Sequence, residues 1–218
     1  MNIKHFRSLM LCGLAIVALA TSTVLRFSFA DDAPASSEFC PYVTKDGSIS
    51  RPTDFREKFT YLGTFADATK DEKSIDELHN VYARPQDVAA YLRDGKFPDG
   101  AVLVKEVCGT ASENLTTGKA HWATDTKLWF VMIKDAKGRF PGNDLWGDGW
   151  GWALFYANEP ARNVATDYTT DCKTCHVPAK KDDWVYIRGY PILADHAHAD
   201  NPHAGSLNVP QKKVQPNH

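Results

Sequence analysis

Hydrophobic residues between positions 51 and 193 fall into short runs that are separated by turn residues. Alternating or β-branched runs predict five strands, at 57–65, 78–83, 101–107, 127–134 and 151–156. A short strand or extended segment is expected at 184–187. Residues 85–93 instead have apolar positions at helical spacing, with a proline at the start and Gly95 beyond the end. Turns are predicted at 97–100 and 135–138. The pattern predicts an α+β fold, β-dominant, with an antiparallel sheet and a few helices.

The beginning of the chain has the pattern of a signal peptide. Lys4, His5 and Arg7 precede an apolar stretch at 8–20, and small residues at 28 and 30 predict cleavage near Ala30. The apolar stretch is short for a membrane span. We therefore expect an exported, periplasmic protein without a stable membrane anchor.

The remaining chain divides into three parts by composition. Residues 31–50 are expected to form a poorly ordered arm, residues 51–194 the folded domain, and residues 195–218 a disordered tail rich in proline and polar residues. The tail is interpreted as solvated, although its four histidines could bind stray metal: His196, His198, His203 and His218.

The charge balance argues against a polyanionic partner. The chain has 25 lysines and arginines against 27 aspartates and glutamates, a net charge of −2. Residues 1–30 contain Lys4, Arg7 and Arg26 but no acidic residue, so their removal would change the net charge from −2 to −5. An acidic protein gives no reason to expect nucleic acid or an anionic membrane surface as partner.

The most specific motif is C-x-x-C-H at residues 172–176, formed by Cys172, Cys175 and His176. This is the attachment signature of a c-type haem. Each thiol adds across a vinyl group of the haem, and the histidine becomes the proximal ligand of the iron. Because c-type haem is attached outside the bacterial cytoplasm, the motif agrees with the signal peptide. The predicted cofactor is therefore covalently attached haem c, with iron.

Two other interpretations of the motif fit the sequence less well. A zinc site needs two further ligands, usually as a second close pair, and the tight pair available is His196 with His198. A redox disulfide is expected in a βαβ setting, whereas a polar turn at 158–163 precedes the motif. Two more cysteines of the exported chain, Cys40 and Cys108, could form a disulfide or remain thiols.

The position of the motif argues against an ordinary electron-transfer cytochrome c. Such proteins are helical, carry the motif near the N-terminus and take a methionine ligand from a later segment. Here the methionine that remains after export is Met132, and no methionine follows Cys172. A histidine–methionine haem site is therefore not expected.

The order of the blocks resembles the cytochrome P460 family, including the β-sheet cytochromes c′. The matching residues are 59–63, 80–82 with Pro85, 97–100, 102–106, 134–135, 152–155, 172–176 and 190–193. The resemblance implies a homodimer and a five-coordinate haem with an open distal side. It also implies redox chemistry of small nitrogen compounds, namely hydroxylamine oxidation or nitric oxide handling, and a periplasmic electron acceptor or donor.

Three residues carry what the resemblance implies for the site. Lys105 corresponds to the lysine that P460 joins to a meso carbon of the porphyrin; the alternative is an edge-strand lysine that reaches water. Phe130 stands where P460 has a distal glutamate that accepts protons, and a phenyl ring can accept none. His79 stands in place of a distal arginine and could be a donor, a base, a sixth ligand or a structural residue. His121 is a weaker distal candidate.

Three functions therefore remain open at this point. An enzyme that oxidises hydroxylamine would carry the Lys105–porphyrin bond. A protein that binds or scavenges nitric oxide would bind it rapidly without hydroxylamine turnover. An electron carrier would have a six-coordinate, low-spin haem with His79 or His121 as the sixth ligand.

Overall fold

The computed structural model describes residues 36–37 and 39–193. The predicted signal peptide at 1–30 and tail at 195–218, with its histidines, lie outside the described residues. Within the described part, no helix is long and apolar enough to cross a membrane.

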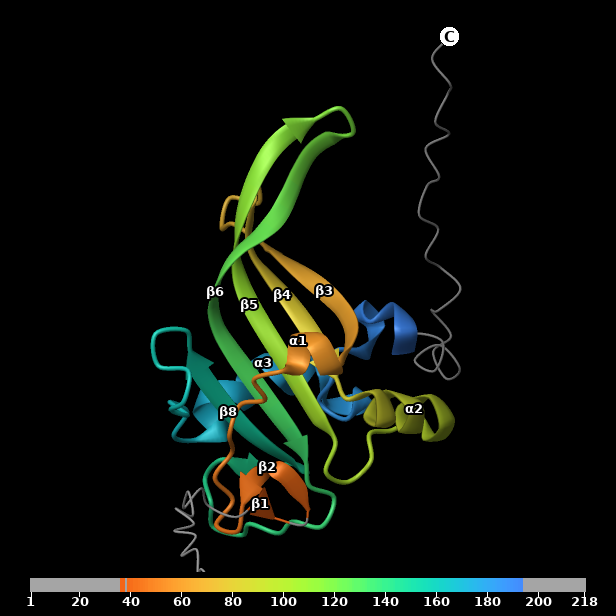
Figure 1. Cartoon of the computed structure of the whole chain (residues 1–218), viewed down its shortest axis with the longest axis vertical. Helices are drawn as coiled ribbons and strands as arrows, with labels where there is room; N and C mark the ends of the chain where they lie inside the picture. The colour runs from red at the N-terminus through yellow and green to blue at the C-terminus, as the bar shows by residue number, and fades with distance from the viewer. Residues whose placement is uncertain (1–35, 38, 194–218) are drawn as a thin grey trace, which may run out of the picture. The chain divides into compact units, whose positions relative to one another are not determined.

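A six-stranded antiparallel sheet forms the body, in the order β3-β4-β5-β6-β8-β7 (Figure 1). Its strands are β3 (Thr60–Ala68), β4 (Ile75–Ala83), β5 (Val102–Leu115), β6 (Gly118–Lys134), β7 (Trp146–Gly147) and β8 (Trp150–Tyr156). The strands β1 (Ser36–Ser37) and β2 (Cys40–Thr44) pair separately. The predicted β-dominant antiparallel architecture is confirmed.

The helices are short and lie mostly around the sheet. They are α1 (Phe55–Lys58), α2 (Pro85–Asp94) and α3 (Thr174–His176). α2 ends as its sequence predicts, because Gly95 adopts a left-handed φ of 68° and donates its N–H to the Tyr91 carbonyl. A π-helical turn, η1 (Thr169–Lys173), precedes α3, and two 3₁₀ turns follow it, η2 (Val177–Asp182) and η3 (Ile187–Gly189).

The sheet separates two apolar clusters. Val102, Val104 and Val131 point to one face, where they pack with Cys40 of β2 and Phe55 of α1. The alternate residues of the same strands point to the other face and pack against α2 and the C-terminal turns; they include Leu103, Met132 and Trp152, together with Cys172 and Trp184. The period-2 alternation of β5 therefore gives each face its own core.

Two predicted strands of the folded body differ from the structure. The predicted strand at 57–65 begins as α1, because Phe55 is buried and Lys58 pairs with Asp54 one turn earlier. The segment 184–187 is not extended, since Asp183 and Trp184 have φ of 57° and 67° and turn the chain into η3.

The predicted poorly ordered arm at 31–50 is wrong for its second half. Cys40, Val43 and Ile49 are buried in the cluster on the β2 face of the sheet. Their apolar spacing allows residues 40–50 to cover that face, and Val43 bridges to Ile49. Cys40 and Cys108 form no disulfide; Cys108 instead lies within hydrogen-bond reach of Asn80 Nδ2 and Thr126 Oγ1.

β5 and β6 run beyond their neighbours as a two-stranded ribbon (Figure 1). β4 last pairs with β5 at Gly109, and β8 first pairs with β6 at Leu128, whereas β5 and β6 pair out to Leu115 and Gly118. The predicted strands stop at 107 and start at 127 because most residues of the ribbon are polar and its few large apolar residues, such as the exposed Leu115 and Trp122, do not alternate.

Asp87 fixes the start of β5 to α2. Its buried carboxylate accepts two hydrogen bonds from Arg84, at 2.6 and 2.8 Å, and one from the Val102 N–H at 2.9 Å.

Asp87→Ala is expected to lower the free energy of unfolding by about 3 kcal/mol, because it leaves the mostly buried Arg84 guanidinium unpaired. Urea denaturation measures this. Asp94→Ala, at an exposed pair, is the control; equal small losses in both variants would contradict the account.

Candidate haem site

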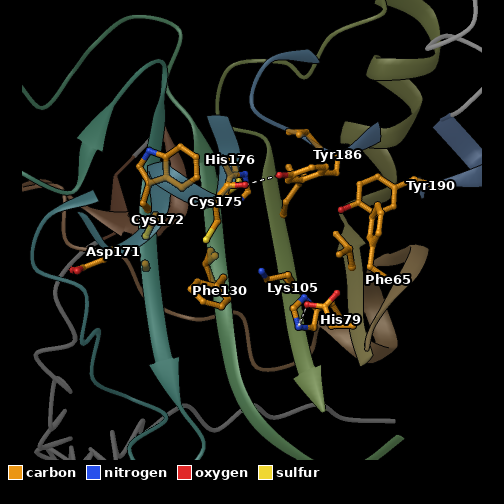
Figure 2. Close-up of a pocket in the computed structure, with 18 residues that line it drawn as sticks. Phe65, His79, Lys105, Phe130, Asp171, Cys172, Cys175, His176, Tyr186 and Tyr190 are labelled. Carbon is orange, nitrogen blue, oxygen red and sulfur yellow. Dashed lines mark hydrogen bonds and ion pairs between the residues drawn. The ribbon is translucent and has the colours of Figure 1, made fainter. Parts of the chain in front are cut away.

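A cavity of about 400 Å³ lies between the sheet face that carries Lys105 and the segment that carries the C-x-x-C-H motif (Figure 2). Its sheet wall includes Phe65, Asp67, His79, Val81, Leu103, Lys105, Phe130, Met132 and Trp152. Its other wall includes Asp171, Cys172, Cys175, His176, Val185, Tyr186 and Tyr190. The volume falls in the usual range for cofactor sites, and the lining is predominantly apolar and aromatic with few polar groups.

Local hydrogen bonds hold the motif in its turn. Asp171 Oδ2 accepts the N–H groups of Thr166 and Asp167, at 2.8 and 3.2 Å, and these bonds lower the pKa of Asp171. Asp167 Oδ1 in turn accepts the N–H of Thr169 at 2.7 Å. Asp167, before the turn, thus satisfies a free N–H group at its start, whereas Asp171, inside the turn, ties the turn to the loop that precedes it.

The ring of His176 is held by one backbone carbonyl. Its Nδ1 lies 2.7 Å from the Trp184 oxygen, and since a carbonyl can only accept, Nδ1 carries the proton. Nε2 is then the nitrogen with a free lone pair, as a metal ligand requires. Burial lowers the pKa of His176, which favours the same neutral imidazole. The left-handed backbone at Asp183 and Trp184 accompanies this contact. The donor set therefore fits a haem iron.

The thiols of the motif fit covalent attachment better than redox exchange. Cys172 and Cys175 both line the cavity and are not bonded to one another. Redox cysteines have a lowered pKa, whereas burial raises the pKa of Cys172 to about 12. The described residues also contain no cluster of three or more His, Cys, Asp and Glu side chains that could bind a metal ion. The zinc and redox interpretations thus gain no support.

Lys105 and Phe130 face each other across β5 and β6. They are direct cross-strand partners, and Lys105 Nζ lies 4.3 Å from the centroid of the Phe130 ring. Burial lowers the pKa of the Lys105 ammonium, and a cation–π contact offsets only part of that cost. In Figure 2 both side chains lie below Cys175 and His176. The sequence-predicted pair is therefore brought into the same cavity as the motif.

Of the two predicted distal histidines, one lies in the cavity. His79 lines it, and its Nε2 is 3.3 Å from Glu77 Oε2 and 3.5 Å from Asp67 Oδ2. His121 pairs with Ser112 on the β5–β6 ribbon and is not among the cavity residues. The prediction of His121 as a distal candidate is therefore wrong, because the ribbon carries it past the end of β4.

Sequence reasoning missed several members of the site. The aromatic rings of Phe65, Tyr186 and Tyr190 form one end of the cavity, with edge-on contacts from Phe65 to the two tyrosines. Trp152 stands edge-on to His176, with 5.0 Å between ring centroids. Strand alternation could have placed Phe65 and Asp67 on one face, but not shown which face. The Trp184 carbonyl has no sequence signal, because any residue supplies one.

This fold and this cavity define a c-type haem protein built on an antiparallel sheet. The family model of cytochrome P460 matches residues 52–187, which is most of the described chain. The chain therefore belongs to the cytochrome P460 family, and its cofactor is a c-type haem with iron. No curated protein matches it.

Proposed function

We propose that this chain is an exported haem protein with an open distal site that oxidises hydroxylamine. The observation that supports it best is the content of one cavity: a haem-binding motif with an oriented His176, and Lys105 with Phe130 on the facing sheet. Met132 also lines the cavity, where it pairs with Trp152, whose ring stands next to His176. In this proposal Met132 would lie on the side of His176, and the opposite side of a bound haem would be left to a small ligand.

Each residue has a defined task in this proposal. A bound haem would supply a binding position for a small nitrogen compound and a route by which electrons leave it. Cys172 and Cys175 would tether the group, and His176 would hold its iron through Nε2. Phe130 restricts the space for larger ligands and offers no hydrogen bond to water. Lys105 stands ready to bond to the macrocycle edge.

Steady-state turnover tests the proposed activity. Purified holoprotein with hydroxylamine is expected to reduce a one-electron dye in proportion to protein concentration. The dye alone, and the holoprotein without hydroxylamine, serve as blanks. Absence of protein-dependent dye reduction, with a fully loaded haem, would contradict the proposed activity.

Nitric oxide binding is the second candidate, and Phe130 favours it. The phenyl ring at the family's proton-accepting position cannot take a proton from hydroxylamine, whereas nitric oxide has none to give. This alternative predicts rapid binding of nitric oxide to the reduced protein together with no dye reduction by hydroxylamine. The same two assays therefore separate the candidates.

Lys105→Met is expected to change the haem itself. Burial lowers the pKa of Lys105, so its amine is neutral more often than that of an exposed lysine and is the better nucleophile. A bond from Nζ to a meso carbon replaces one N–H and one C–H, and the two protons and two electrons that are lost have to be taken up by an added two-electron oxidant of the peroxide class. The intact mass of the native holoprotein should therefore be two hydrogens below that of haem plus chain, and the Soret band should be red-shifted.

Lys105→Met should abolish the red shift, whereas Lys119→Met, on the exposed ribbon, should not. A native spectrum unchanged by Lys105→Met would exclude the bond.

We also propose the remaining properties that the family suggests: export, a homodimer and a periplasmic electron partner. A mature N-terminus near Asp31 would support export. Exposed Leu115 and Trp122 on the ribbon supply apolar surface that a second copy could cover. Light scattering of the holoprotein measures the oligomeric state directly, and a monomer at micromolar concentration would count against the dimer.

A further inference from the structure

The cavity contains few groups that could take a proton from a bound ligand. The side chain of Phe130 has no atom that accepts a proton. The carboxylate of Asp171 already accepts backbone N–H groups, and the hydroxyl of Tyr186 donates to the Cys175 carbonyl at 2.5 Å. Tyr190 is almost fully buried, which raises its pKa. Lys105 also has a basic nitrogen in the cavity, but the proposed function assigns that nitrogen to the edge of the macrocycle, and the carboxylate of Asp67 lies at the exposed side of the lining. His79 then remains as a basic nitrogen of the lining on a mostly buried side chain, which is 18% exposed.

His79 stands close to Lys105 in the sheet. Val81 on β4 pairs with Lys105 on β5, and His79 is two residues along β4 on the same face, where it pairs with Val107. His79 and Lys105 are therefore diagonal neighbours, within reach of long side chains. Figure 2 shows His79 directly beneath Lys105, on the cavity side of the sheet.

Two carboxylates orient the imidazole from the solvent side. Asp67 on β3 and Glu77 on β4 both approach Nε2, at 3.5 and 3.3 Å. Among the described residues Nδ1 has no hydrogen-bond partner. In the neutral ring, Nε2–H donates to the carboxylates, which leaves the Nδ1 lone pair as the acceptor. The side chain of Asp67 is 58% exposed and that of His79 is 18% exposed, so Asp67 is the one in contact with water.

Glu77 is held in its charged form. Lys127 on β6 donates to Glu77 Oε1 at 2.8 Å, and this bond lowers the pKa of Glu77. The charged and titratable groups around His79 are thus Asp67 from β3, Glu77 from β4, Lys105 from β5 and, through Glu77, Lys127 from β6. Both carboxylates lie within 3.5 Å of Nε2, so the ring nitrogen on the solvent side has acceptors for its proton.

We propose that His79 accepts the proton released by a ligand that binds in the cavity and passes it to solvent through Asp67. This role rests on the proposed function. A proton acceptor is missing at Phe130 on β6, and His79 on β4 takes its place. Oxidation of hydroxylamine to nitroxyl releases two electrons, which pass to an exported one-electron carrier, and two protons, which leave through His79. His79 is then a proton acceptor, not an iron ligand.

Cyanide and carbon monoxide binding test the proposal without hydroxylamine. Hydrogen cyanide must lose a proton to bind ferric haem as cyanide, whereas carbon monoxide binds ferrous haem with no proton transfer. His79→Gln keeps a polar side chain of similar reach but is not a base. We expect it to slow cyanide association at pH 7 by about 100-fold, the lower end of general-base effects. Carbon monoxide association should change by less than about twofold, since access is unaltered.

Matched variants decide the interpretation. Asp67→Asn should slow cyanide association in the same direction but less, and His121→Gln on the ribbon should leave both rates unchanged. Unchanged cyanide association in His79→Gln would overturn the proposal, as would equal changes with both ligands, which indicate a steric role. A shift from low-spin to high-spin haem in His79→Gln would overturn it too, by making His79 a ligand. None of these outcomes depends on hydroxylamine turnover, which tests the proposed function separately.

Discussion

His176→Gly is expected to abolish turnover with the haem still attached. The thioether bonds to Cys172 and Cys175 remain, but the iron loses its protein ligand and the Trp184 carbonyl loses its donor. Even the loss of an outer-shell partner of a metal ligand costs about 10–100-fold, so the loss of the ligand should reduce hydroxylamine-dependent dye reduction by more than about 100-fold. Haem staining on a denaturing gel should be unchanged.

Rescue separates this effect from misfolding. The glycine leaves space next to Trp152 that free imidazole can fill, so millimolar imidazole should restore part of the activity and the native absorption spectrum. Full activity of His176→Gly without imidazole would show that another residue binds the iron from the proximal side, and the site described above would then be wrong.

Cys172→Ala combined with Cys175→Ala, in a Lys105→Met background that removes the proposed third bond, is expected to remove covalent haem entirely. Thioether bonds survive denaturation, whereas haem held by His176 alone does not, so the double variant should lose the haem stain on a denaturing gel. Each single variant keeps one thioether and should retain a weaker stain. The apoprotein should also unfold at a lower urea concentration, because a ligand bound to the folded state alone stabilises it.

Cys108→Ala is the matched control for the cysteine variants. Cys108 is buried on β5 like its neighbours but contacts Asn80 and Thr126, away from the cavity residues. Its replacement should therefore leave the haem stain at the native level. A persistent stain in the double variant would mean that another side chain attaches the haem.

Much of the fold could be predicted because its signals are local. The strand over 101–107 is a β-branched run, and α2 carries proline and glycine at its two ends. The short helix α1 was missed because the apolar spacing around Phe59 suits a strand equally well. The ribbon from Thr110 to Thr126 was missed because strand pairing there is supported by backbone bonds, not by an apolar face.

The site was predictable only where chemistry requires a specific side chain. The motif at 172–176 is such a case, and Lys105 with Phe130 followed from a family resemblance. The acidic pair around His79 was not visible, because Asp67 and Glu77 read as ordinary polar positions near a turn. They lie next to His79 because of the register between β3 and β4, in which Phe65 pairs with His79 and Asp67 pairs with Glu77. Cross-strand register is set by turn geometry and packing together, which single residues do not reveal.

The absorption spectrum of the reduced holoprotein tests the central claim most directly. We expect one c-type haem on Cys172 and Cys175, with His176 as a ligand on one side and an open position on the other. The spectrum should then be that of high-spin ferrous haem without a sharp α band, and its Soret band should be red-shifted if Lys105 is bonded to the macrocycle. A sharp low-spin α band in the native protein would contradict it, because an intrinsic sixth ligand would then fill the position where hydroxylamine or nitric oxide has to bind.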